Sequence, residues 1–221
     1  MLLSGMLLVL DPALAIPIHG VVQLASNSTR LLVFLKHVRW RLTGLFAASS
    51  AVGAVLGAFV MAEVHDKAWL RLAIGVFILL ATHAPKPKAA GSSSRTWIFA
   101  PVGAMAGFMG MLVGATGPLI APFFLRENIL KEELIATKAT CQAFVHLWKI
   151  PLFYFIGERI GFAYSEHLPI IAALVAMVIV GTLTGRRIVK HVSEGLFVVL
   201  VKGALTLIAL KLIFHDGLGL L

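Results

Sequence analysis

The sequence predicts an all-α integral membrane protein built of two inverted repeats of transmembrane helices. Three observations support this prediction: the apolar content, a repeat at a constant offset of 119 residues, and the distribution of Lys and Arg among the loops. Hydrophobic residues make up 59% of the 221 residues, charged residues make up 13%, and the mean hydropathy is +0.95. Soluble domains carry about 45–50% apolar and about 25% charged residues. The apolar excess extends along the whole chain, so several spans are expected.

Long apolar runs separated by polar connections define the individual elements. A helix needs about 20 residues to cross a hydrocarbon core of ~30 Å. The Pro-, Lys- and Ser-rich segment 84–96 is expected to be a cytoplasmic loop between a first repeat, 1–83, which is short at its N-terminus, and a second repeat, 97–221. One span, 42–61, is rich in Gly and Ala and suits close helix packing. The six expected spans are 14–34, 42–61, 69–82, 134–155, 168–183 and 196–214.

The segment 97–125 is interrupted near its centre by Gly114, Gly117 and Pro118. Gly and Pro are poor helix formers, and non-helical backbone persists at membrane depth only when it is buried in protein or lines a cavity. The segment is therefore either a kinked span or a re-entrant hairpin. If it crosses, the Lys and Arg residues outside the spans divide 8 to 7 between the two sides; if it returns, they divide 11 to 4. The positive-inside rule favours the hairpin, with the basic loops in the cytoplasm and the chain in the inner membrane.

Two polar stripes occur at the repeat offset in otherwise apolar helices, each on one helix face at positions i, i+4 and i+7. A hairpin that returns to its own side changes the direction in which each later helix crosses the membrane. The two helices that carry the stripes then run in opposite directions, which gives an inverted repeat. In proteins of that architecture, binding sites lie near the midplane beside broken helices. The stripes are Gln23, Asn27 and Arg30 in the first repeat, and Gln142, His146 and Lys149 in the second.

Charge is distributed unevenly between the spans and the loops. All ten acidic residues fall in loops or at the ends of spans, whereas four cations fall within spans or near their ends. A charge at the bilayer centre costs at least ~2.5–3.5 kcal/mol and usually marks the path of a substrate or ion. A bound anion is therefore the expected partner, although Arg30 and Lys149 could instead snorkel to the interface. The four cations are Arg30, Lys138, Lys149 and Lys202.

The polar stripes and the broken segment together supply the candidate binding residues. Backbone N–H groups in the 114–117 turn could bind an anion as helix N-termini do, or its glycines could only permit tight packing. This turn is not a Walker loop, because no Gly-Lys-Ser/Thr sequence follows it. The expected substrate-binding residues are Gln23, Ser26, Asn27, Arg30, Gly114, Thr116, Gly117, Thr137, Lys138, Gln142, His146 and Lys149.

Several functional classes do not fit the sequence. The net charge of +9 is attributed to basic cytoplasmic loops, so no nucleic-acid partner is expected. Cys141 is the single cysteine, and the eight histidines show no metal-ligand spacing within one segment, so neither a metal nor a cofactor is predicted. No Ser/His/Asp or paired-carboxylate arrangement lies within the spans, which argues against an enzyme. The expected partners are a small anion and the lipid bilayer, with a homo-oligomer left open.

Three stretches of the chain resemble the TauE/SafE (sulfite exporter, TSUP) family, and the resemblance covers nearly the whole chain. It implies a bacterial-type inner-membrane permease of two related halves that exports or imports sulfite, organosulfonates or other small organic anions. Family members usually begin with a Gly-rich broken element. By the 119-residue offset, residues 1–10 correspond to 120–129, so this chain is expected to begin just after that element. The stretches are Pro17-Ile-His-Gly-Val-Val-Gln23-Leu-Ala-Ser26-Asn27-Ser-Thr-Arg30, Gly110-Met-Leu-Val-Gly114-Ala-Thr-Gly117-Pro118-Leu-Ile-Ala-Pro122-Phe-Phe, and Ile135-Ala-Thr137-Lys138-Ala with Gln142, His146 and Lys149.

Secondary transport of a small anion by alternating access is the function expected from these observations, with Arg30 and Lys149 supplying the positive charge. Two other functions remain open at this point. An anion channel would use the same polar residues. A non-transporting membrane subunit would instead pair its intramembrane cations with the acidic residues of a partner protein.

Overall fold

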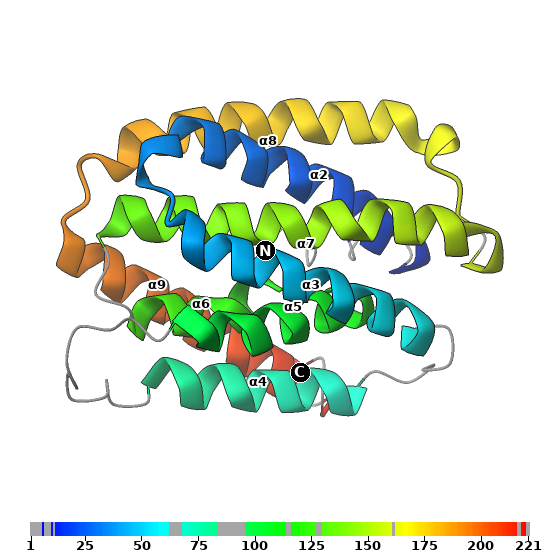
Figure 1. Ribbon diagram of the computed structural model, residues 1–221, viewed down its shortest axis with the longest axis horizontal. Coiled ribbons are helices and arrows are strands. Elements are labelled where there is room, and N and C mark those ends of the chain that lie inside the picture. Colours follow the sequence, from blue (N-terminus) through cyan, green and yellow to red (C-terminus); the bar gives the residue numbers. More distant parts are fainter. Residues whose placement is uncertain are drawn as a thin grey trace.

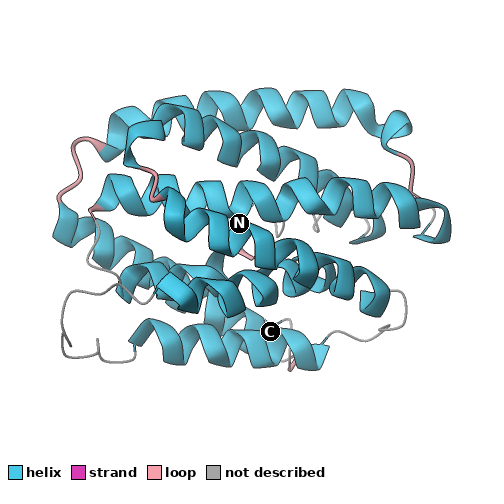
Figure 2. Cartoon of the chain, viewed as in Figure 1, coloured by secondary structure: helices cyan, strands magenta, loops and turns pink. Residues whose placement is uncertain are grey.

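The computed structural model describes residues 12–61, 68–83, 96–113, 116–126, 130–160, 162–215 and 218–219, together with Met6 and Leu10. Helices are the only regular secondary structure in this part of the chain, and they pack side by side (Figure 1 and Figure 2). Short 3-10 turns cover Leu35–His37, Thr96–Ile98 and Tyr164–His167, and a π-helical turn covers Lys211–His215. The α-helices are α2 (Pro12–Val33), α3 (Trp40–Met61), α4 (Ala68–His83), α5 (Phe99–Val113), α6 (Gly117–Arg126), α7 (Lys131–Ile160), α8 (Leu168–Val189) and α9 (Glu194–Leu210).

Two helices extend past the predicted spans where charged residues flank the apolar run. α7 covers Lys131–Ile160 where the sequence predicted 134–155, and α8 covers Leu168–Val189 where it predicted 168–183. The extension of α8 contains two arginines in its last turn. Arg, Lys and Glu are strong helix formers, and basic side chains stabilise the negative end of the helix dipole. The hydropathy pattern therefore placed the C-terminal ends of both helices too early in the sequence. The expected loop 84–96 lies outside the described residues except for Thr96.

Three described helical segments are long and apolar enough to cross a membrane: Trp40–Met61, Tyr164–Val189 and Glu194–His215. α2 and α7 have 22 and 30 residues and thus sufficient length, but they carry the polar stripes. α4, at 16 residues, is shorter than the about 20 residues of a full span. α8 and α9 expose large apolar side chains along their length. Helices that are apolar on nearly all faces belong in lipid, so this is a multi-pass integral membrane protein.

α3 and α5 pack in parallel and approach each other very closely. A Cβ added to Gly53 of α3 would lie 1.9 Å from the carbonyl oxygen of Ala104. A Cβ added to Gly107 of α5 would lie 2.0 Å from the carbonyl oxygen of Ser50. These are backbone-to-backbone contacts that leave no room for a side chain. The prediction that the small residues of 42–61 serve close helix packing is therefore confirmed.

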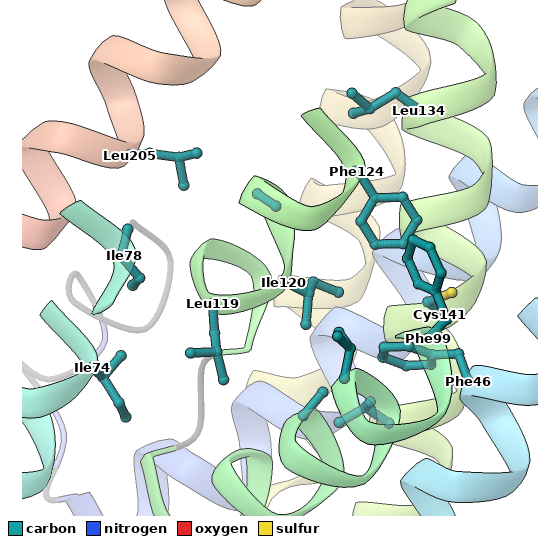
Figure 3. Packing of buried hydrophobic residues seen from close by; sticks show 14 of the residues in the cluster. Phe46, Ile74, Ile78, Phe99, Leu119, Ile120, Phe124, Leu134, Cys141 and Leu205 are labelled. Carbon is teal, nitrogen blue, oxygen red and sulfur yellow. The ribbon is translucent and has the colours of Figure 1, made fainter. Parts of the chain in front are cut away.

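α5 and α6 fold back on each other as a hairpin. Phe99, the first residue of α5, packs against Phe124 near the end of α6 with ring centroids 5.1 Å apart. Figure 3 shows these two rings beside each other. The described part of the break between the helices is Thr116, whereas the predicted site residue Gly114 lies outside the described residues. This geometry is the hairpin, and not the kinked span, of the two arrangements considered for 97–125.

A buried apolar cluster holds the hairpin in place. Phe46 of α3, Phe99 and Phe124 are completely or almost completely buried, and Cys141 of α7 lies next to them (Figure 3). The cluster also includes Ile78 of α4, so four or more helices contribute to it. In a bilayer, such packing stabilises a fold through van der Waals contact, because lipid tails are as apolar as the side chains. The cluster therefore fixes the depth that the hairpin tip reaches.

α2 and α7, which carry the two polar stripes, pack against each other in opposite directions. His19 near the start of α2 contacts His146 in the second half of α7. Arg39, which follows α2, pairs through Nη2 with Oε2 of Glu133 at the start of α7, 2.8 Å away. Lys131 also connects the start of α7 to the turn before α9. The starts of α3, α7 and α9 therefore lie at one end of the bundle, as Figure 1 also shows.

Candidate functional site

Lys149 lies in the middle of α7 and is completely buried, with 0% of its surface exposed. Its aliphatic chain lies over Gly20 of α2, where an added Cβ would be 3.9 Å from Cε of the lysine. The Nζ atom lies 5.6 Å from the centroid of the Phe153 ring, within the range of a cation–π interaction. The side chain does not snorkel to the surface of the bundle, so that alternative is excluded for Lys149. Because buried cations in membrane helices usually mark the path of a substrate or ion, Lys149 is a candidate binding residue.

The break between α5 and α6 lies against the same part of α7. A Cβ added to Gly117, the first residue of α6, would lie 2.8 Å from Nε2 of Gln142. A Cβ added to Gly110 would lie 3.2 Å from Cγ2 of Thr116 and 4.0 Å from Cδ of Lys149. The first N–H groups of a helix have no intrahelical acceptor and carry partial positive charge. The hairpin therefore adds backbone donors to the side-chain donors of α7.

Three buried polar atoms of the predicted site residues have no hydrogen-bond partner in the part of the chain that the structure describes. They are Nδ1 of His146, Nδ2 of Asn27 and Oγ1 of Thr116. The exposed fractions of these residues are 1%, 0% and 0%. Most buried polar atoms in proteins are hydrogen-bonded, so each of these atoms is suited to bind a ligand or water. All three are donors or can become donors, which again fits an anion.

A second group of predicted residues lies toward the C-terminal end of α2. Arg30 donates a hydrogen bond of 3.0 Å from Nη1 to Oδ1 of Asn27. Lys138 of α7 lies near enough to Arg30 for the two positive charges to repel each other. Arg30 is ten residues beyond Gly20, the contact of Lys149, which corresponds to about 15 Å along a helix. Arg30 and Lys149 therefore occupy separate positions along the interface between α2 and α7.

The remaining predicted residues have local partners or are buried in the interface. Nε2 of Gln23 lies 3.2 Å from Nε2 of His19. Oγ1 of Thr137 accepts a 3.1 Å hydrogen bond from the backbone N–H of Arg39 and is fully buried. Thr137 thus fastens the turn after α2 to α7. Ser26 is 3% exposed.

Two residues of the site were not among the predicted binding residues. His19 lies one turn before Gln23 on the same helix face, and this spacing is a signal that could have included it. Gly20 leaves room for Lys149 of another helix. Its role depends on a contact between elements 129 positions apart in the chain, which no local pattern indicates.

The described residues contain no group of three or more His, Cys, Asp or Glu side chains that could hold a metal ion. The acidic residues that the structure describes lie at helix ends or in a short turn. The described site residues between α2, α7 and the hairpin carry cationic, imidazole and amide side chains. That chemistry suits an anion. The described acidic residues are Glu132, Glu133 and Glu158 in the end turns of α7, Glu166 in the turn Tyr164–His167, and Glu194 in the first turn of α9.

Apolar helices, a broken hairpin and a buried cation beside the break together define a class of membrane transport proteins. In that class, discontinuous helices place backbone groups near the midplane, where substrate binds. The chain matches the family Sulfite exporter TauE/SafE over residues 1–212 and belongs to it. The resemblance seen in the sequence is thus confirmed, and the family consists of transporters, not enzymes. No curated protein and no solved structure matches the chain.

Proposed function

We propose that this protein is a secondary transporter that carries a small anion by alternating access. The observation that supports this most directly is the position of Lys149, a fully buried cation of α7 against the break between α5 and α6. Gln142 and His146 lie on neighbouring turns of the same helix. A cation surrounded by backbone and side-chain donors is an arrangement that binds anions. The family supports export as the type of activity.

Each residue near the hairpin tip has a role in this proposal. Lys149 supplies the charge, and Gln142 and His146 donate hydrogen bonds. The N–H groups of Gly117 and Leu119 in the first turn of α6 act as the ends of broken helices do toward anionic substrates, whereas Pro118 between them has no N–H. Thr116 adds a hydroxyl. A sulfite or sulfonate group presents three acceptor oxygens to such donors, so the proposed substrates are sulfite, an organosulfonate or a related sulfur-containing or organic anion.

The second group of residues forms the path toward one end of the bundle. Arg30 and Lys138 repel each other, and an anion that passes between them would relieve that repulsion. Asn27 orients the Arg30 guanidinium through its 3.0 Å hydrogen bond. We assign Gln23, Ser26 and Thr137 to the walls of the same path.

The orientation and the repeat are also proposals. The end of the bundle that holds the starts of α3 and α7 carries Arg39, Arg41 and Lys131, so the positive-inside rule places it in the cytoplasm. The antiparallel packing of α2 and α7 supports an inverted repeat, in which the 119-residue offset relates Arg30 to Lys149. Repeats related in this way can exchange conformations, which opens the site to each side in turn.

Uptake of radiolabelled sulfite into proteoliposomes tests the proposal. Lys149→Met is expected to weaken the apparent affinity by about 10–150-fold, because a hydrogen bond to a charged group is worth about 1.5–3 kcal/mol. Lys36→Met is the matched control, since Lys36 is an exposed lysine in the turn Leu35–His37. The same uptake by wild type and Lys149→Met would overturn the assignment of the site.

Counterflow in the same vesicles separates the transporter from the two alternatives. Unlabelled sulfite inside the vesicles accelerates the influx of label through a carrier and does not accelerate influx through a channel. A non-transporting subunit gives no protein-dependent flux in either experiment. The carrier is therefore supported only by a flux that responds to sulfite on the opposite side of the membrane.

A further inference from the structure

His19 is a buried titratable residue that the proposed anion site does not use. It lies on α2 and is 3% exposed. Its ring packs edge-on against the ring of His146, with centroids 5.7 Å apart and an interplanar angle of 79°. The next residue, Gly20, lies over the aliphatic chain of Lys149. His19 is thus adjacent to the anion site and comes from the opposite helix.

Among the described residues, the titratable side chain that packs directly against His19 comes from α7. His146 interacts electrostatically with both His19 and Lys149 and so connects them. The apolar cluster that includes Ile18 of α2 also contains side chains of α8 and α3, and Tyr164 packs against it. A proton on His19 therefore changes the charge beside the anion site. The side chains in or against this cluster include Leu174, Val175 and Val178 of α8, and Ala54 and Ala58 of α3.

The second repeat carries a lysine at the position that corresponds to His19. The 119-residue offset relates His19 to Lys138, as it relates Gln23 to Gln142 and Arg30 to Lys149. Lys138 lies near Arg30, and His19 lies near Lys149, so the two environments correspond as well. The two halves thus place side chains that can carry a positive charge at corresponding positions, a lysine in one half and a histidine in the other.

Gln23 can accommodate both protonation states of His19. The Nε2 atoms of the two side chains lie 3.2 Å apart. A neutral imidazole accepts a hydrogen bond from the amide N–H group, and a protonated imidazole donates to the amide oxygen after the amide rotates. Histidine is the side chain whose charge changes most readily near physiological pH, which suits a proton carrier.

We propose that His19 takes up a proton when an anion binds beside Lys149, so that the anion and the proton cross the membrane together. The proposal rests on the proposed function, because it needs the anion at that site. The bound anion stabilises the imidazolium, and the imidazolium in turn strengthens anion binding, since the coupling between two sites is reciprocal. The proton comes from water on the side from which the anion enters and is released with it on the other side.

Calorimetry of sulfite binding in buffers of different ionisation enthalpy measures the protons taken up per anion. Wild type is expected to take up close to one more proton than His19→Gln between about pH 6 and pH 8. Sulfite itself titrates in this range, but its contribution is the same for both proteins and cancels in the difference. His191→Gln is the control, because His191 is exposed and lies after α8. It is expected to behave as wild type.

His19→Lys separates coupling from structural damage, because lysine holds its proton to a higher pH than histidine and is the residue that the other repeat carries at this position, Lys138. At pH 8 this variant is expected to bind sulfite about 5–150-fold more tightly than wild type, with no proton uptake attributable to residue 19. Damage to the fold would weaken binding in both variants. Equal proton uptake by wild type and His19→Gln, or weaker binding by His19→Lys, overturns the role of His19. Absence of sulfite binding by wild type overturns the proposed function itself.

Discussion

Replacing Gly53 by Ala should separate α3 from α5 and destabilise the hairpin. The new Cβ would lie 1.9 Å from the carbonyl oxygen of Ala104, with the carbonyl carbon at 2.7 Å and Cα at 2.9 Å. These are backbone atoms and cannot rotate away, so the helices must move apart locally by at least about 1.1 Å to reach a 3.0 Å contact. Overpacking of this kind costs about 1–3 kcal/mol. On the scale of soluble domains this is a fall of roughly 2–12 °C in Tm.

The single cysteine provides the assay. Cys141 is fully buried in the cluster that anchors the hairpin, so a fluorogenic maleimide reacts with it only when that cluster opens. Heating the purified protein in detergent with this reagent gives the Tm of the region that the substitution affects. The measurement also reports on the correct part of the molecule, because Cys141 and Phe99 of the hairpin belong to the same cluster.

Gly44→Ala is the matched control for this experiment. Gly44 lies in the same helix, and a Cβ added there would have no atom within 4 Å. A surface substitution of this type usually changes stability by less than about 0.5 kcal/mol. Equal shifts for the two variants would refute the close packing of α3 and α5 as the reason for the small residues in this helix.

Three further predictions concern the tip, a surface ion pair and the orientation. Gly117→Ala directs its Cβ at the movable end of Gln142, so the Tm should stay within about 2 °C. The sulfite affinity in the uptake assay should fall about tenfold. An unchanged affinity would show that Gln142 does not belong to the site. Arg39→Ala breaks an ion pair between Arg39 and Glu133, whose side chains are 37% and 29% exposed, respectively. Such partly exposed pairs contribute about 0.2–1 kcal/mol. Calorimetry should therefore show a Tm loss of at most about 4 °C. Lys36→Cys in a Cys141→Ala background should react with an impermeant maleimide in inside-out vesicles and not in intact cells. Reaction in intact cells and not in inside-out vesicles would mean that the topology is opposite to the proposed one.

The positions of the helices and of the polar stripes follow from the sequence because each rests on local chemistry. Apolar runs identify α3, α8 and α9, and the i, i+4, i+7 spacing places Gln142, His146 and Lys149 on one face of α7. The helix break at Thr116 follows from the glycines around it. The charge balance of the loops predicted the return of the hairpin, which the contact between Phe99 and Phe124 bears out.

Other features depend on contacts between distant segments, which spacing within a helix does not determine. From the sequence, Arg30 and Lys149 were expected to lie at one site. The crossing of α2 and α7 instead places Lys149 next to Gly20 and Arg30 near Lys138. The contact between His19 and His146 arises from the same crossing. The predicted helix ends came too early because the hydropathy criterion assigns charged residues to loops. Charged residues are nevertheless good helix formers and are favourable in the end turns of helices.

The most direct test of the central claim is the thermal stability of the purified protein with and without sulfite, followed by tryptophan fluorescence. A ligand at 100 times its Kd adds about 2.7 kcal/mol of stability, or roughly 5–11 °C in Tm. Wild type should gain this stability with sulfite and not with chloride at equal ionic strength, and Lys149→Met should lose the gain. No shift in wild type, or the same shift in Lys149→Met, would contradict an anion site at Lys149 and the hairpin tip.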